Sequence, residues 1–124
     1  MNTTLWIVAS VLALAFLFAG ALTTVHGKEK LKSNGLAWVE GFPLGAVKTI
    51  GLLEILGAIG LILPALTGIA PVLVPLAATG IAVLMVGAAL THARRKEGSA
   101  IAVNVVLFAL AAFVAWGRFG SYAF

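Results

Sequence analysis

Four long apolar runs occupy most of the sequence, and they constrain its fold more than any other feature. They cover approximately residues 5–25, 46–63, 71–91 and 99–116. Each run is about 18 to 21 residues long, and an α-helix needs roughly 20 apolar residues to cross the hydrocarbon core of a bilayer. The runs lack the two-residue alternation of a membrane β-barrel, so their backbone polar groups are best satisfied within helices. The sequence therefore predicts an all-α fold, an integral membrane four-helix bundle that forms a single transmembrane domain over residues 1–124.

The composition excludes several other classes of protein. With 62% hydrophobic and 10% charged residues, the chain lies outside the range of soluble domains. Its net charge of +4 comes from short basic clusters between the apolar runs, so we predict no nucleic-acid binding. The sequence contains no cysteine, which excludes disulfides, iron–sulfur clusters and thiolate zinc sites. We expect no metal site and no intrinsic cofactor, and no nucleophile–base pair, phosphate loop or dinucleotide fingerprint is present.

The charges of the connecting segments orient the predicted bundle. They form two basic clusters: Lys28, Lys30 and Lys32 after the first run, and Arg94, Arg95 and Lys96 after the third. Both clusters must lie on one side of four spans, whereas the other side carries only Arg118 beyond the fourth run. By the positive-inside rule, we expect a multi-pass protein of an inner or plasma membrane with both termini outside the cytoplasm. Residues 1–4 carry no Lys or Arg, so we expect the first run to be a retained helix and not a cleaved signal peptide.

The first connecting segment, residues 26–45, is longer than a simple turn. Leu36, Val39 and Phe42 recur every three residues around Trp38. This pattern predicts a short interfacial helix or a partly re-entrant lid. Two roles remain open for it, a gate over the cytoplasmic mouth of the bundle and a connector that rests on the membrane.

The second apolar run carries the residues that are most unusual for a membrane helix. Lys48, Gly51, Glu54, Gly57 and Gly60 recur at intervals of three. Gly51, Glu54 and Gly57 share one helical face of about 120°, which we expect to point into the bundle. Glu54 lies about 12 Å from the predicted start of its helix, near the middle of the membrane. A carboxyl group there costs a few kcal/mol unless it is paired or protonated.

Further polar residues lie toward the same side of the predicted bundle. Asn104 lies about 6 Å into the fourth helix, and His92 ends the third. We therefore predict an intramembrane polar pocket formed by Lys48, Glu54, His92 and Asn104. Two interpretations remain open, a binding or proton-handling site around Glu54 and a structural hydrogen bond between helices.

The segment from Lys48 to Pro64, KTIGLLEILGAIGLILP, resembles the signature of the DoxX-like family of small four-helix membrane proteins. Outlying features are similar to the family's pattern in order and spacing: Pro71 to Leu76, and the segment Gly87 to His92 with the arginines that follow it. The resemblance singles out eight residues: Lys48, Gly51, Glu54, Gly57, Gly60, Pro64, His92 and Arg118.

The resemblance implies several functions. Some members of the family are subunits of a thiosulfate:quinone oxidoreductase, and similar proteins assist receptor assembly. For this chain the resemblance implies an accessory subunit, such as one of a membrane oxidoreductase, that binds a quinone or a lipid around Glu54. An autonomous redox enzyme is not expected, because the sequence lacks a haem or flavin motif. The alternatives are a non-catalytic assembly factor or chaperone for membrane proteins, and a small transporter. Association with partner membrane proteins or into a homo-oligomer also remains open.

Overall fold

The computed structural model describes residues 1–33, 37–120 and 122–123, without the side chains of Lys28, Ala37 and Trp38. Four long helices follow one another along the chain: α1 (Asn2–Val25), α3 (Leu44–Thr67), α4 (Leu73–Arg94) and α5 (Gly98–Phe119). Two short helices lie between α1 and α3: α2 (Lys28–Ser33) and the 3₁₀ helix η1 (Ala37–Gly41). Each long helix is apolar and long enough to cross a membrane. The prediction of an all-α membrane bundle is confirmed.

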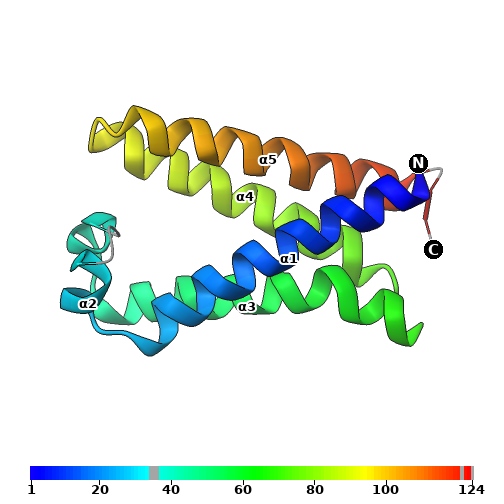
Figure 1. Ribbon diagram of the computed structural model, residues 1–124, viewed down its shortest axis with the longest axis horizontal. Helices are drawn as coiled ribbons and strands as arrows, with labels where there is room; N and C mark the ends of the chain where they lie inside the picture. The colour runs from blue at the N-terminus through cyan, green and yellow to red at the C-terminus, as the bar shows by residue number, and fades with distance from the viewer. Residues whose placement is uncertain (34–36, 121, 124) are drawn as a thin grey trace.

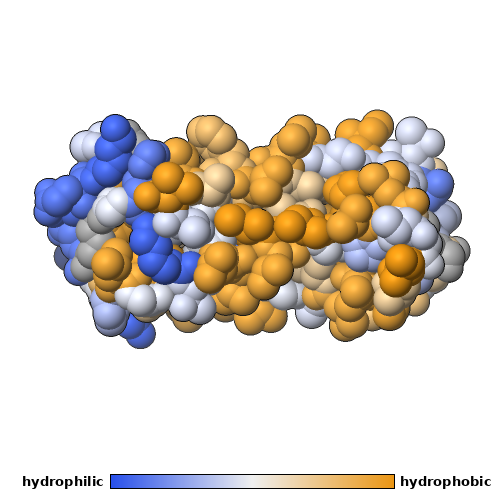
Figure 2. All heavy atoms as spheres, turned by 90° about the horizontal axis from the view of Figure 1, so that it is seen from below, coloured by the Kyte–Doolittle hydropathy of each residue, from blue (hydrophilic) through white to orange (hydrophobic). Residues whose placement is uncertain are grey.

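The long helices form two pairs, because α1 packs along α3 and α4 packs along α5 (Figure 1). Contacts between α3 and α4 are less extensive, and those between α1 and α5 are fewer still. Both chain termini and the turn between α3 and α4 lie at one end of the bundle, here called the terminal end. At the other end, here called the basic end, lie α2, η1 and the turn 95–97. In Figure 2 hydrophilic residues gather at the basic end, and the middle of the visible face is hydrophobic.

Most helix ends extend beyond the apolar runs that predicted them, although α4 begins at Leu73, two residues after the predicted start of its run. α3 begins at Leu44, and α4 and α5 each continue three residues past their predicted ends, because backbone hydrogen bonds persist where the side chains become polar. The second apolar run was predicted over residues 46–63, but its helix continues through Pro64. Pro64 is buried inside α3, which ends at Thr67 with Gly68 in the left-handed conformation (φ 71°). The Gly68 N–H donates to the Pro64 carbonyl, so the C-terminal cap lies one turn after the proline.

Close packing joins α1 to α3 in the half of the bundle nearer the basic end. A Cβ atom added to Gly20 would lie 2.7 Å from the carbonyl oxygen of Gly51, so the two backbones are in direct contact. Toward the terminal end, a core of side chains from all four long helices is buried, including Leu12, Leu61 and Val114. Small residues allow such approach in lipid, where apolar burial alone does not drive helices together.

The segment between α1 and α3 packs on the basic end of the bundle. Leu31, Val39 and Val47 form a second buried cluster, and Phe42 packs against it. Lys32 lies 3.1 Å from the Glu40 carboxylate, and this hydrogen bond raises the pKa of the Lys32 ammonium. Where the sequence predicted a short interfacial helix or a partly re-entrant lid around Val39 and Phe42, the structure has the 3₁₀ helix η1, with α2 before it. Leu36 lies outside the described residues, as does the side chain of Trp38.

Candidate functional site

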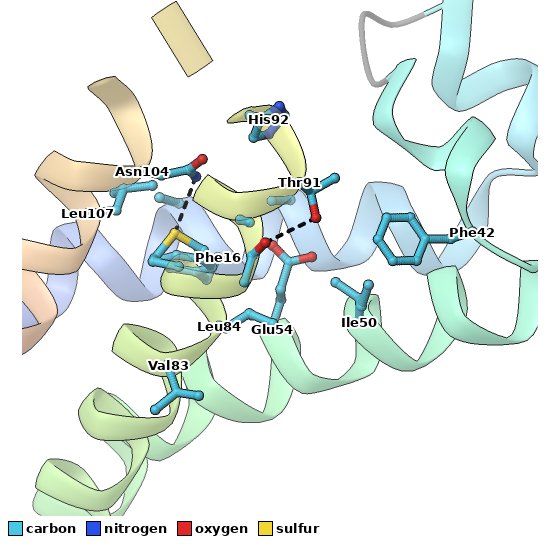
Figure 3. A pocket seen from close by; sticks show the side chains of 15 residues that line it. Phe16, Phe42, Ile50, Glu54, Val83, Leu84, Thr91, His92, Asn104 and Leu107 are labelled. Carbon is cyan, nitrogen blue, oxygen red and sulfur yellow. Dashed lines mark hydrogen bonds between the residues drawn. The ribbon is translucent and has the colours of Figure 1, made fainter. Parts of the chain in front are cut away.

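A cavity of about 460 Å³ lies among the four long helices, toward the basic end (Figure 3). Its walls are mostly apolar, and Phe42 closes one side of it. Four polar side chains also contribute to the lining: Glu54 from α3, Thr91 and His92 from α4, and Asn104 from α5. The cavity thus combines apolar walls with a few polar groups, as small-molecule sites commonly do.

Glu54 projects from the middle of α3 into this cavity (Figure 3). It is ten residues from the start of α3, which corresponds to about 15 Å of helix. The residue is only 8% exposed, and its carboxyl group has no hydrogen bond or ion pair with any described residue. Gly51 and Gly57, which flank Glu54 by one turn, lie against Thr24 of α1 and Ile81 of α4, respectively. The small flanking residues let the neighbouring helices approach on both sides while the carboxyl group occupies the space between them.

Asn104 lies on the opposite wall of the cavity. Its Nδ2 atom lies 3.6 Å from the sulfur of Met85, to which it donates a weak hydrogen bond. Its Oδ1 atom is buried and has no partner in the part of the chain that the structure describes. Buried polar atoms are normally satisfied, so this oxygen marks a place where a hydrogen-bond donor is missing.

The two polar residues of α4 lie at the mouth of the cavity near the basic end. His92 Nδ1 lies 2.8 Å from the Glu97 carboxylate, which also accepts a hydrogen bond from Arg95 Nε at 3.2 Å. The hydrogen bond with His92, assisted by Arg95, lowers the pKa of Glu97 below its usual range. The Thr91 hydroxyl donates to the carbonyl oxygen of Gly87 at 3.0 Å, within its own helix. These contacts fix the His92 ring and the Thr91 hydroxyl at the rim of the cavity.

Lys48 does not line the cavity, contrary to the sequence-based prediction. Its Nζ atom donates to the carbonyl oxygen of Thr23 at 2.9 Å and to that of His26. Carbonyl groups at the end of a helix lack partners within the helix, and a flexible ammonium group can reach them. Lys48 therefore ties the end of α1 to α3 and leaves Glu54 without a basic partner from its own helix.

The other residues singled out by the family resemblance lie outside the cavity. Gly60 packs against Ala77, where an added Cβ atom would come within 2.8 Å of the alanine side chain. Arg118 is buried at the terminal end, where its Nη1 atom donates to Asn2 Oδ1 at 2.6 Å and to the Tyr122 carbonyl at 2.8 Å. Its guanidinium also lies 5.9 Å from the centre of the Trp6 ring. Gly60 and Arg118 thus hold the bundle together, whereas three of the four predicted pocket residues share one cavity.

Apart from Phe42, the apolar residues of the cavity wall were not predicted from the sequence. Phe16, Met85 and Leu107 line it, but they lie in apolar helices where lipid-facing, core and cavity positions have the same composition. Among the described residues, no group of three or more His, Cys, Asp or Glu side chains is placed to hold a metal ion.

Comparison with known proteins adds one relationship. A family model with the description DoxX-like family matches residues 7–114. No curated protein matches the chain, and neither does any solved structure. The matched range includes every residue that lines the cavity and ends before Arg118.

Proposed function

The chain belongs to the DoxX-like family, and from this premise we propose that it is an accessory subunit that binds a lipophilic molecule, a quinone or a lipid, in the cavity around Glu54. One observation carries the proposal. A buried carboxyl group without a partner among the described residues projects into an apolar cavity from the middle of a helix long enough to cross a membrane. Such a group is costly in the membrane, and residues of this kind usually serve a function.

The size and surroundings of the cavity support this proposal. A volume of about 460 Å³ falls within the range of roughly 300 to 1,000 Å³ that small-molecule sites occupy. Val83 lines the cavity and is also 67% exposed, so the cavity reaches the lipid-facing surface beside α4. A lipophilic molecule can therefore enter from the bilayer, and its polar head can reach Glu54.

The packing at the terminal end favours a binding site over a transport path. Between Glu54 and the terminal end, the described core consists of closely packed apolar side chains from all four long helices. A transported polar molecule would have to displace this core. A cavity that is closed toward the terminal end suits a ligand that enters and leaves by one opening, not a substrate that crosses the membrane.

The accessory role requires a surface for a partner protein or a second copy. α5 has the smallest buried share of the four spans. Its exposed apolar residues include Val103, Val105, Val106 and Phe108. This surface contacts lipid, and we propose that it also receives the partner membrane protein, such as an oxidoreductase that supplies the redox chemistry. The basic end is proposed to face the cytoplasm of an inner or plasma membrane, which places both termini outside.

Native mass spectrometry of the detergent-purified protein tests the binding proposal. We expect the protein to retain a lipophilic molecule, and Glu54→Leu to release it. Glu40→Gln is the matched control, because Glu40 is an exposed carboxylate at the basic end that does not line the cavity. Size-exclusion profiles of the variants show whether each still folds.

Two results would contradict the proposal. One is a protein that carries no ligand even when quinones and lipids are supplied in excess. The other is a Glu54→Leu variant that retains as much ligand as the control. If Glu54→Leu retains its partner protein while bulky substitutions on α5 abolish partner capture, the assembly-factor alternative is favoured.

A further inference from the structure

We infer that the cavity selects lipophilic molecules whose head group donates hydrogen bonds, such as a hydroxyl or an ammonium, over heads that only accept them. This inference rests on the proposed function, since it concerns the ligand of the same cavity. Its basis is that the polar lining holds a buried acceptor without a donor, Asn104 Oδ1, while Thr91 Oγ1 and His92 Nδ1 are engaged elsewhere. The donors that remain are the second N–H of Asn104 and the O–H of Glu54 when it is protonated.

The orientation of the Asn104 amide is set by the atom that it contacts. Met85 is a thioether, which can accept a weak hydrogen bond and cannot donate one. The amide therefore directs its Nδ2 atom toward the sulfur, as the 3.6 Å contact shows. The opposite orientation would place two acceptors against each other. Oδ1 is then left as a buried acceptor that has no partner among the described residues.

Thr91 also has its donor engaged. A hydroxyl group has a single proton, and that of Thr91 is donated to the Gly87 carbonyl at 3.0 Å. The lone pairs of the Thr91 oxygen remain, and the residue lines the cavity. A ligand that meets this hydroxyl therefore meets an acceptor.

The tautomer of His92 follows from its partner. Glu97 is ionised, because its pKa lies below the usual range, and a carboxylate only accepts hydrogen bonds. His92 Nδ1, at 2.8 Å, must therefore carry the proton that it shares with Glu97. In the neutral ring the other nitrogen, Nε2, is then an acceptor.

Glu54 is the fourth polar side chain of the cavity lining. A carboxyl group offers an acceptor oxygen in either protonation state; it only accepts when ionised, and its O–H can also donate when it is protonated. The rest of the described lining is apolar or contributes the Met85 sulfur; it includes no Lys, Arg, Ser, Tyr or Trp side chain. The nearby cations do not compensate, since Lys48 binds carbonyl groups of α1 and Arg95 binds Glu97.

The consequence for a ligand follows from the cost of burying polar groups. A hydroxyl or ammonium head that leaves water can donate to Glu54, Asn104 or Thr91 and recover its hydrogen bonds. A ketone or ether head can at most accept from the second N–H of Asn104 or from a protonated Glu54, and it leaves Asn104 Oδ1 buried without a donor. For a quinone in two redox states, the inference predicts that the cavity holds the hydroquinone in preference to the quinone.

A matched pair of probes tests the inference with the intact protein in lipid nanodiscs. The probes are 4-nonylphenol and its methyl ether 4-nonylanisole, which share a tail and ring and differ in the O–H group. We expect the phenol to bind about tenfold more tightly than the anisole at equal concentration in the lipid. The reason is that one additional hydrogen bond strengthens binding by about this factor. Decylamine and decyltrimethylammonium form a second pair, which separates donation by N–H groups from attraction of positive charge.

Two threonine variants provide the matched control. Thr91→Val removes a cavity acceptor, and we expect it to weaken phenol binding about threefold to tenfold while leaving anisole binding unchanged. Thr79→Val removes a hydroxyl that makes the equivalent bond within the same helix, to the Pro75 carbonyl at 2.8 Å, but does not line the cavity. We expect Thr79→Val to change neither probe.

The outcomes separate this inference from the proposed function. If phenol and anisole bind equally and both are lost in Glu54→Leu, the inference is overturned and the proposed function stands. The same holds if the trimethylammonium probe binds as tightly as the amine, because charge and not donation would then select the ligand. If no probe binds, both the inference and the proposed function fail.

Discussion

Substitution of Gly20 by alanine should weaken the pairing of α1 with α3. The added Cβ atom would lie 2.7 Å from the Gly51 carbonyl oxygen and 3.0 Å from the Ile55 backbone nitrogen. Because both are backbone atoms, no side-chain rotation relieves the clash, and the helices must separate locally by about 0.7 Å to reach ordinary contact distances. A gap of this size removes about a quarter to a half of the dispersion energy of the affected contacts. We expect the free energy of unfolding to fall by about 1 to 3 kcal/mol.

The matched control for this prediction is Gly80→Ala. Gly80 is also within a membrane-spanning helix, but an added Cβ atom there would have no neighbour within 4 Å among the atoms described. Its replacement should leave stability unchanged or raise it slightly, since alanine favours helix more than glycine does. Unfolding by SDS in mixed micelles, followed by the fluorescence of the 3 tryptophans, measures both variants. If Gly20→Ala is as stable as Gly80→Ala, α1 and α3 are not in backbone contact and this account of the packing is refuted.

Three further predictions concern the basic end and the orientation of the bundle. Lys48→Met should lower the free energy of unfolding by about 1 to 3 kcal/mol, because it leaves carbonyl groups of α1 without a donor. Lys30→Met, at an exposed position, is the control. Equal stability of the two variants would contradict the role of Lys48 in tying the end of α1 to α3. The pKa of Glu97 is lowered in the folded state. Its contacts therefore stabilise the turn after α4 when the pH is above the usual carboxyl pKa, and this stabilisation is lost as the pH falls below that value. Hydrogen exchange of the turn should therefore accelerate in acid, and Glu97→Gln should remove that pH dependence. The chain has no cysteine, so a single cysteine can be introduced by Ser33→Cys or by Thr3→Cys and labelled. We expect a membrane-impermeant maleimide to label the Ser33→Cys variant only from the cytoplasmic side and the Thr3→Cys variant only from the outside.

Much of the fold follows from the sequence because the bilayer limits what an apolar chain can do. A run of about 20 apolar residues must satisfy its own backbone in lipid, so the existence and approximate position of the four long helices could be predicted. Their ends could not be placed as well. Pro64 illustrates the reason, since the helix passes through it to the cap at Gly68, and proline is tolerated in membrane helices when the surrounding structure accommodates it.

The candidate site was predicted in part. Glu54, His92 and Asn104 were identified because polar residues are rare in apolar helices, and all three line one cavity. Lys48 was assigned to the same pocket from its position in the sequence, but its side chain reaches the end of α1 instead. The direction of a long side chain depends on which acceptors the neighbouring helix offers, and the sequence of α3 alone does not contain that information.

The sequence by itself thus determined that the chain crosses the membrane as helices and that Glu54 lies near the middle of one of them. Hydrophobicity is a local property, and 1.5 Å of rise per residue converts sequence position into depth. Only the tertiary structure decided which helices pair, where a cavity remains between them and which hydrogen-bonding atoms face it. These features depend on contacts between residues far apart in the chain, such as Asn104 with Met85 and Gly20 with Gly51. The acceptors that surround Glu54 become evident only when those contacts are known.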